Sequence, residues 1–482
     1  MQLRLKKIIA VGIALMIALK LFTFGIHFPL TDRARGDAFQ YIFIANHFSD
    51  YPSDILGYAG DRTVGFPLFE YLIRQFLGLF TSINVAMSEA HFVLWIQIIC
   101  TTMLIIHLVT AWYFSAWART VNLVKSDNGV LLLFVFLASY PAMIGLTTTP
   151  LTDTLATDLI LCATILLDSS LKTNKKYRAL LFSVTAGLIF GFSILVRPGS
   201  IIALAVAFAI IVLITFFIGS RKTNLIFASI LACVAILMPF VHNCTGKFST
   251  VCLQNPHTFE STLSAQVGLK GTRTLWSKVP VNKDPEGIPT LPDDTMVKNY
   301  YRRCHLTAIV GLQESSLTGC LLSRPLALPA YVVKKWMGLF DHFRFTPYLD
   351  LKTPLWILWL SRAYDVLAWI GLALIFITPF KATRRLSGFS SDGFSISNIT
   401  PVLLFAYSLI MLAQHTLLHV EERYGFPLIP VCAVALIAYC EAVARQKQSI
   451  DWRKTIPLGL YCLFVAALFI IQTIIWDHTV FY

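Results

Sequence analysis

Residues 8–28 read IIAVGIALMIALKLFTFGIHF, and this stretch sets the class of fold. An α-helix needs about 20 predominantly apolar residues to cross the hydrocarbon core of a bilayer. Lys6 and Lys7 precede the stretch, and it lacks a small-residue cleavage site, so we predict a retained membrane anchor and not a signal peptide. Lys20 lies inside it, and we expect its ammonium group to snorkel to the outer interface or to pair within the bundle, with contact to a lipid phosphate as the alternative.

Apolar runs of this length recur along the chain. Of the 482 residues, 56% are hydrophobic and 13% are charged, which indicates a polytopic membrane protein and not a nucleic-acid-binding one, despite the net charge of +13. We predict an all-α bundle of about eleven transmembrane helices, each satisfying its own backbone hydrogen bonds in lipid. The predicted spans lie near residues 8–28, 91–117, 128–146, 150–170, 179–196, 200–218, 224–242, 354–379, 400–418, 426–444 and 456–476.

The connections between these spans alternate in charge. Cytoplasmic loops of membrane proteins carry an excess of Lys and Arg, and every second short loop here is basic. We therefore predict a cytoplasmic amino terminus and a periplasmic carboxyl terminus. The basic loops contain Arg4, Lys6 and Lys7; Arg119 and Lys125; Lys172, Lys175, Lys176 and Arg178; Arg221 and Lys222; Lys381, Arg384 and Arg385; and Arg445, Lys447, Arg453 and Lys454.

This topology leaves two long segments on the outer side. Residues 29–90 contain apolar stretches at 38–48 and 66–80, whose spacing suits helices lying in the membrane interface. Residues 243–353 are rich in turn-forming residues and form a larger outer loop domain. The predicted organisation is an amino-terminal transmembrane module (1–242), this loop domain, and carboxyl-terminal transmembrane helices (354–482).

Cysteine usage agrees with the predicted sidedness. An even number of cysteines falls in the second outer segment, in the compartment where disulfides persist. Local pairing of the first with the second and of the third with the fourth is one of three connectivities. The remaining six lie in predicted spans as small apolar groups, and the outer spacing is too wide for a zinc site, so we predict that these cysteines bind no metal. The four outer cysteines are Cys244, Cys252, Cys304 and Cys320.

Polar residues gather at the outer ends of several spans. Groups placed this way can converge on one cavity, or they can pair simply to fix helix ends. The candidates are Asp37 and Arg62 in the first outer segment, Asp153 at the start of the fourth span, Arg197 at the end of the fifth, and Glu422, Arg423 and Tyr424 before the tenth.

The sequence around these residues resembles the GT-C superfamily of membrane glycosyltransferases. The resemblance implies transfer of a sugar from a polyprenyl-phosphate donor on the outer face of the membrane, with a first-loop carboxylate as catalytic base. Many relatives have Glu where this chain has Asp153. The similar elements are the acid after the first span (Asp37), Arg-x-x-Gly-Phe-Pro (62–67), Thr-Pro-Leu-Thr-Asp (149–153), Arg-Pro-Gly (197–199) and Glu-Arg-Tyr (422–424).

Sugar transfer from a lipid phosphate needs a base for the acceptor hydroxyl and cations for the departing phosphate. We expect Asp37 to be the base, with helix capping as the alternative role and Asp32 as the competing acid. Asp153 is expected to serve catalysis or to orient the acceptor, whereas Asp158, more than a turn deeper, should pair inside the bundle.

Arginine presents a planar fork that suits phosphate oxygens, so Arg62, Arg197 and Arg423 are the candidate donor-phosphate ligands, with Glu422 and Tyr424 beside the last of them. No cofactor is predicted, and the sequence leaves a metal requirement open. The expected partners are the lipid-linked donor, membrane lipids and a cell-surface glycan or lipid acceptor, in a bacterial inner membrane. A lipid-linked glycan flippase or an O-antigen polymerase is the alternative, although a transporter should show repeated halves that this chain lacks.

Overall fold

Every element that the computed structural model of the chain describes is a helix. No strand occurs among the described residues, which confirms the predicted all-α class. The structure describes residues 2–29, 37–56, 63–78, 89–217, 222–245, 336, 339–340, 353–377, 399–417 and 422–445.

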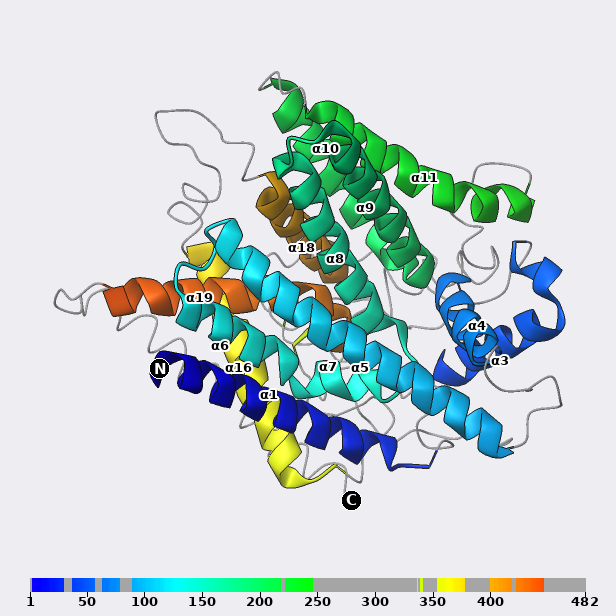
Figure 1. The fold of residues 1–482 in the computed structure, drawn as a ribbon, viewed down its shortest axis with the longest axis horizontal. Coiled ribbons are helices and arrows are strands. Elements are labelled where there is room, and N and C mark those ends of the chain that lie inside the picture. The colour runs from blue at the N-terminus through cyan, green and yellow to red at the C-terminus, as the bar shows by residue number, and fades with distance from the viewer. Residues whose placement is uncertain are drawn as a thin grey trace, which may run out of the picture. The chain divides into compact units, whose positions relative to one another are not determined.

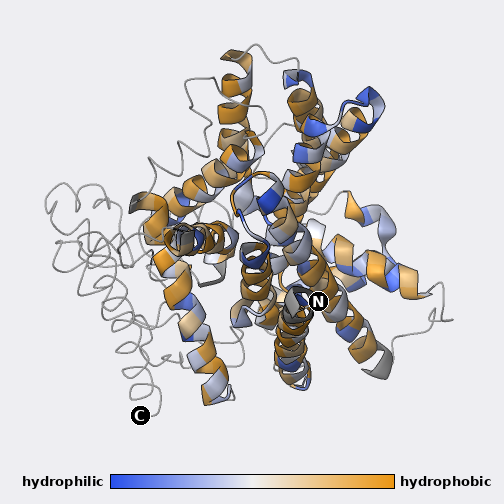
Figure 2. Cartoon of the chain, turned by 60° about the vertical axis from the view of Figure 1, so that its left-hand side comes forward, coloured by the Kyte–Doolittle hydropathy of each residue, from blue (hydrophilic) through white to orange (hydrophobic). Residues whose placement is uncertain are grey.

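Nine of the described helices are long and apolar enough to cross a membrane, and each coincides with a predicted span. Their residues are largely hydrophobic along the length of each helix (Figure 2). The chain is therefore an integral membrane protein. The nine are α1 (Gln2–Ile26), α5 (Glu89–Thr120), α8 (Thr152–Lys172), α9 (Lys176–Val196), α10 (Ile201–Phe217), α11 (Thr223–Thr245), α16 (Leu355–Ile377), α18 (Ile399–Leu417) and α19 (Ile429–Arg445), all labelled in Figure 1.

The span predicted at 128–146 is bent. It consists of α6 (Asp127–Ala138) and α7 (Pro141–Thr147), which meet at 50°. Pro141 lacks a backbone N–H, and its ring disfavours helical geometry at Tyr140, which has φ −66° and ψ 112°. Counted as one span, this pair brings the total to 10 among the described residues, and the predicted span at 456–476 lies outside them.

The chain divides into two compact units. The first contains Met1–Pro256, Arg344–Ile410 and Phe426–Ser449; the second contains His257–Phe343, Met411–Gly425 and Ile450–Tyr482. In the second unit, the Trp336 indole donates to the Thr416 hydroxyl at 2.8 Å. The side chains of the four outer cysteines lie outside the described residues, so their pairing stays a prediction. Among the described cysteines, five are free thiols, as expected for cysteines in spans.

Within the first unit, α8, α9 and α11 lie side by side (Figure 1). Gly187 and Gly191 on α9 face the α11 backbone so closely that a Cβ on either would overlap it. Ser183 donates from its hydroxyl to the Leu225 carbonyl. In a membrane the hydrophobic effect does not drive helices together, because lipid tails are as apolar as the side chains. Close packing of small residues and interhelical hydrogen bonds stabilise the helix contacts instead.

The first turn of α6 is capped by a carboxylate from the far end of the chain. Glu441 on α19 accepts hydrogen bonds from the backbone N–H groups of Lys125 and Ser126, at 2.7 and 2.8 Å, and from the Ser126 hydroxyl. A negative charge here also complements the positive end of the helix dipole. Gly129 lies directly against this carboxylate.

We predict that Glu441→Ala lowers the melting temperature, because it leaves these donors unpaired at a cost of about 1–3 kcal/mol. Glu441→Gln should keep part of the effect, since an amide oxygen still accepts. Lys125→Ala is the matched control, because Lys125 bonds Glu441 through its backbone N–H, which the substitution retains. Thermal unfolding in detergent measures all three; equal losses in Glu441→Ala and Lys125→Ala would contradict the capping role.

Candidate functional site

The first outer segment forms the two predicted helices, α3 (Asp37–Asp50) and α4 (Gly65–Gly78), with a short 3-10 helix at Pro52–Ile55 between them. The Tyr41 and Phe66 rings meet at 5.2 Å, and Arg74 donates to the Asn46 side-chain oxygen at 2.6 Å. These contacts follow the same order along both helices, so α3 and α4 run in the same sense. Asp37, whose backbone opens α3, is therefore at the same end as Gly65; its side chain lies outside the described residues.

That end of α4 docks on the end of α9. Gly65 lies so close to the backbone of Leu195 and Val196 that a Cβ would overlap it, and the Thr63 hydroxyl donates to the Val196 carbonyl at 3.3 Å. This close approach accounts for the glycine of the Arg-x-x-Gly-Phe-Pro stretch. Arg62 lies outside the described residues, but its neighbour Thr63 reaches the residue that precedes Arg197.

Two of the predicted site residues form a buried ion pair. Arg197, which ends α9, donates to a carboxylate oxygen of Asp153 in the first turn of α8, and the two residues are only 9% and 2% exposed. Arg197 is in an extended conformation, with φ −144° and ψ 96°, because Pro198 follows it. The structure thus joins Asp153 and Arg197 directly beneath the docked end of α4.

The backbone leading to Asp153 is irregular and wholly buried. Thr147, Thr148 and Thr149 connect α7 to α8 and have no exposed surface. The first two hydroxyls donate to backbone carbonyls three residues earlier, each at 2.7 Å. The Thr154 hydroxyl donates to the Met143 carbonyl at 3.2 Å, which ties α8 to α7. Side-chain hydroxyls thereby satisfy carbonyls that a continuous helix would satisfy itself.

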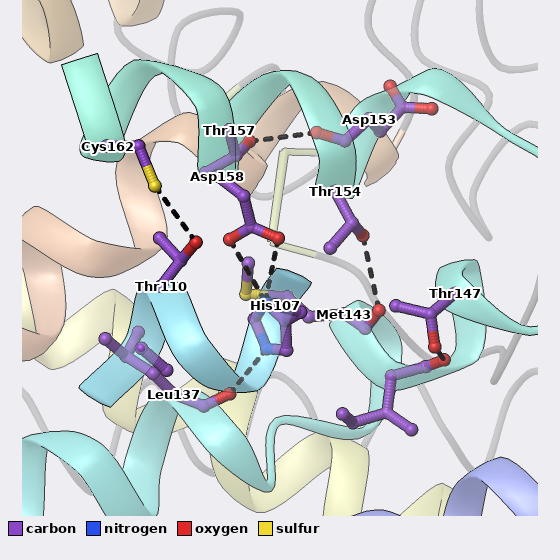
Figure 3. A network of polar contacts seen from close by, with 12 residues as sticks. His107, Thr110, Leu137, Met143, Thr147, Asp153, Thr154, Thr157, Asp158 and Cys162 are labelled. Atoms are coloured by element: carbon purple, nitrogen blue, oxygen red, sulfur yellow. Dashed lines mark hydrogen bonds and ion pairs between the residues drawn. The ribbon is translucent and has the colours of Figure 1, made fainter. Parts of the chain in front are cut away.

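Asp158 faces away from this junction, and its predicted pairing inside the bundle is confirmed. Figure 3 shows its carboxylate pointing toward His107 of α5, with Nδ1 at 3.2 Å from one oxygen. The other ring nitrogen, Nε2, lies 3.1 Å from the Leu137 carbonyl, and since a carbonyl only accepts, Nε2 carries a hydrogen. The imidazole thereby joins the Asp158 carboxylate to the Leu137 carbonyl. Its contacts connect α5, α6 and α8.

Sequence reasoning missed Glu70. This residue is on the buried face of α4, fully enclosed, and neither carboxyl oxygen has a hydrogen-bond partner among the described residues. Burial therefore raises the pKa of Glu70 well above its ordinary value of 4.5. The available signal was its spacing: Glu70 follows Phe66 by four residues, which puts the two on one helix face.

The Glu-Arg-Tyr stretch lies in the second unit and is described by itself. It opens a 3-10 helix over Glu422–Leu428, and the side chains of Glu422 and Arg423 are outside the described residues. The Tyr424 ring contacts the His415 ring at a centroid distance of 5.0 Å. Among the described residues there is also no group of three or more His, Cys, Asp or Glu that could hold a metal ion.

No protein-family model matches this chain, and no curated protein matches it in sequence. Its fold, however, matches crystal structures of the Archaeoglobus fulgidus oligosaccharyltransferase. The apo structure aligns with a TM-score of 0.50 at 14% identity, over 98% of this chain and 55% of that one. The structure tethered to an acceptor peptide with the sequon NVT aligns with a TM-score of 0.51 at 14% identity, over 98% of this chain and 54% of that one. The structure with Zn and sulfate aligns with a TM-score of 0.50 at 14% identity, over 98% of this chain and 52% of that one.

The oligosaccharyltransferase fold is shared. This likeness supports the GT-C-type architecture expected from the sequence, and at this identity it concerns the fold alone. The chain spans about half the length of the oligosaccharyltransferase chains that it matches.

We predict strong coupling between Asp153 and Arg197. Removing one partner of a buried ion pair leaves an uncompensated charge and costs about 3–5 kcal/mol, whereas removing both costs less than the sum. Thermal unfolding of Asp153→Asn, Arg197→Gln and the double variant measures this. Lys7→Gln is the control, because its ion pair with Asp127 at 2.5 Å is partly exposed and should contribute about 1 kcal/mol or less. Additive losses at Asp153 and Arg197 would contradict the buried pair.

We predict that Glu70 makes the protein less stable as pH rises. The unfolded chain ionises this carboxyl above its ordinary pKa, while the folded chain keeps it neutral to higher pH. Its contribution is therefore complete below pH 4.5 and is lost as pH rises through the raised pKa. Glu70→Gln should remove this pH dependence and raise the melting temperature at neutral pH. Gln75→Asn, which changes an exposed side chain of the same helix and removes no acid, should leave the pH dependence unchanged; a loss of it in both variants would refute the assignment.

Proposed function

We propose that this protein is a membrane glycosyltransferase that moves a sugar from a polyprenyl-phosphate donor to a glycan or lipid acceptor at the periplasmic face of a bacterial inner membrane. The supporting observation is the junction at which the amino-terminal end of α4 lies against the last residues of α9, next to the buried Asp153–Arg197 pair. The shared oligosaccharyltransferase fold supports the same class of reaction by analogy.

The proposed chemistry assigns the base to Asp37. Its carboxylate takes the proton of the acceptor hydroxyl as the hydroxyl oxygen bonds to the anomeric carbon of the donor sugar, and the bond to the lipid phosphate breaks with its electron pair on phosphate. The amino-terminal ends of α3 and α4 add partial positive charge near that phosphate. Arg62 supplies a full charge from the segment that precedes α4. Contact of Arg423, Glu422 and Tyr424 with the donor stays a prediction from the sequence.

Arg197 and Asp153 act as a unit in this proposal. The guanidinium carries five N–H donors, so an arriving phosphate can bind Arg197 while sharing it with Asp153. When Arg197 also binds phosphate, its interaction with Asp153 becomes weaker. The Asp153 carboxylate can then accept a hydrogen bond from the hydroxyl group of the acceptor. Donor binding thereby promotes orientation of the acceptor.

We predict that Asp37→Asn lowers transfer by about 10²–10⁴-fold, because a general base contributes this much. Donor binding should remain near wild type, since the amide leaves the arginines in place. Asp32→Asn is the matched control, an acid of the same segment that the proposal leaves out of the chemistry.

The measurement is donor-dependent sugar transfer in proteoliposomes, with labelled lipid followed across the membrane in the same vesicles. Near wild-type turnover in Asp37→Asn would overturn the assignment of the base. Movement of labelled lipid without transfer would overturn the enzyme in favour of a flippase.

A further inference from the structure

We propose that the outer end of α1 carries a second binding site, for the terminal phosphate of a single-chain lipid monophosphate. The site is a groove of about 460 Å³ lined by Lys20, Thr23, Phe24, His27 and Phe28. None of these residues belongs to the junction around Asp153 and Arg197. The groove offers two polar side chains and an aromatic wall on one face of a helix.

Lys20 is the first element of the argument. It is an exposed charge within the candidate span Lys7–Ile26, and its ammonium group lies 5.1 Å from the centre of the Trp356 ring on α16. No acidic side chain pairs with it in the part of the chain that the structure describes. An exposed ammonium group without an acidic partner in the protein can bind an anion from outside it.

The depth of Lys20 indicates which anion is near. Trp356 and Trp359 are 44% and 48% exposed at the start of α16, and tryptophans in such positions concentrate at the level of the lipid headgroups. Because the Lys20 ammonium group lies against Trp356, it is at the level of lipid phosphates. The aliphatic stem of lysine can lie along the apolar helix surface below.

His27 is the second polar group. Its Nδ1 donates to the Thr23 carbonyl at 2.6 Å, which leaves Nε2 as the ring nitrogen for a ligand in the groove. Lys20 and His27 are seven residues apart, roughly 10 Å along the helix axis at 1.5 Å per residue, and on the same face. The long lysine side chain can therefore share an anion with the imidazole.

Two aromatic rings give the groove an apolar surface for a hydrocarbon chain. The Phe24 and Phe28 rings, which line the groove, meet edge to face at 5.0 Å and 84°. A terminal phosphate offers three oxygens and up to two negative charges to Lys20 and His27, whereas a phospholipid diester offers two oxygens and one charge. A lipid monophosphate is what remains of a polyprenyl-phosphate donor after transfer, so its biological identity as product rests on the proposed function.

The test uses the full chain in maltoside micelles and a photoreactive analogue of farnesyl phosphate, with cross-links mapped by mass spectrometry. We expect labelling of the α1 peptide spanning residues 20–28. Lys20→Met should reduce this labelling at least tenfold, since the loss of one charge-assisted contact is enough for a factor of about ten. Lys20→Arg should keep it. Lys176→Met, which removes an exposed lysine at the start of α9, is the matched control and should label like wild type.

Competition identifies the ligand chemistry. Unlabelled farnesyl phosphate should abolish α1 labelling, while farnesol, inorganic phosphate and phosphatidylglycerol at equal concentration should not. Equal competition by phosphatidylglycerol, or unchanged labelling in Lys20→Met, would overturn the proposal. Labelling confined to residues 149–200 would overturn the α1 site and leave the proposed enzyme standing. Undiminished transfer in Asp37→Asn with α1 labelling intact would refute the proposed base alone.

Discussion

The end of the described bundle where α9 ends and α8 begins depends on one interaction, the buried ion pair between Arg197 and Asp153. Two charges leave water at a cost that their attraction repays only with good geometry and further hydrogen bonds. The geometry comes from adjacent helices, one followed by Arg197 and the other beginning at Thr152. Gly65 and Thr63 lie against the last residues of α9, directly before Arg197, so the start of α4 packs next to the pair.

The threonines near the ion pair are explained by the path of the backbone between α7 and α8. Where α7 ends and α8 begins, the chain loses the hydrogen bonds of a continuous helix while remaining buried, so the missing partners have to come from side chains. Thr147, Thr148 and Thr154 supply them with hydroxyls that reach carbonyls of α7. The backbone of Arg197 also has hydrogen-bond partners. Its N–H donates to the Ser193 carbonyl at 2.8 Å, and its carbonyl accepts from the Ser200 hydroxyl at 2.6 Å. With the backbone satisfied locally, the two charged side chains pair with each other.

The spans were predictable because the length of an apolar run is a local property, and the predicted ranges match the described helices closely. The helices at 38–48 and 66–80 were predictable for the same reason. The bend at Pro141 could have been predicted, because a proline within a span usually bends the helix. It was missed because the whole window is apolar and was read as one continuous span. The pairing of Asp153 with Arg197 was not predictable, because it joins residues 44 positions apart and depends on how α8 and α9 pack. Glu70 was missed because an acid in a short interfacial helix is normally predicted to be exposed. Its burial depends on how α4 packs, which the sequence of α4 does not give.

An arginine at position 197 suits a shared role better than a lysine would. An ammonium group is a compact charge that an adjacent carboxylate largely occupies, so a lysine paired with Asp153 would have to break that contact to bind phosphate. A guanidinium spreads its charge over a plane with donors on several edges, so a carboxylate and a phosphate can bind different edges at once. In a buried setting this difference is large, because breaking an ion pair there exposes a charge to a medium of low polarity. In the proposed mechanism, sharing avoids that state, because Arg197 can bind the donor phosphate while its ion pair with Asp153 remains.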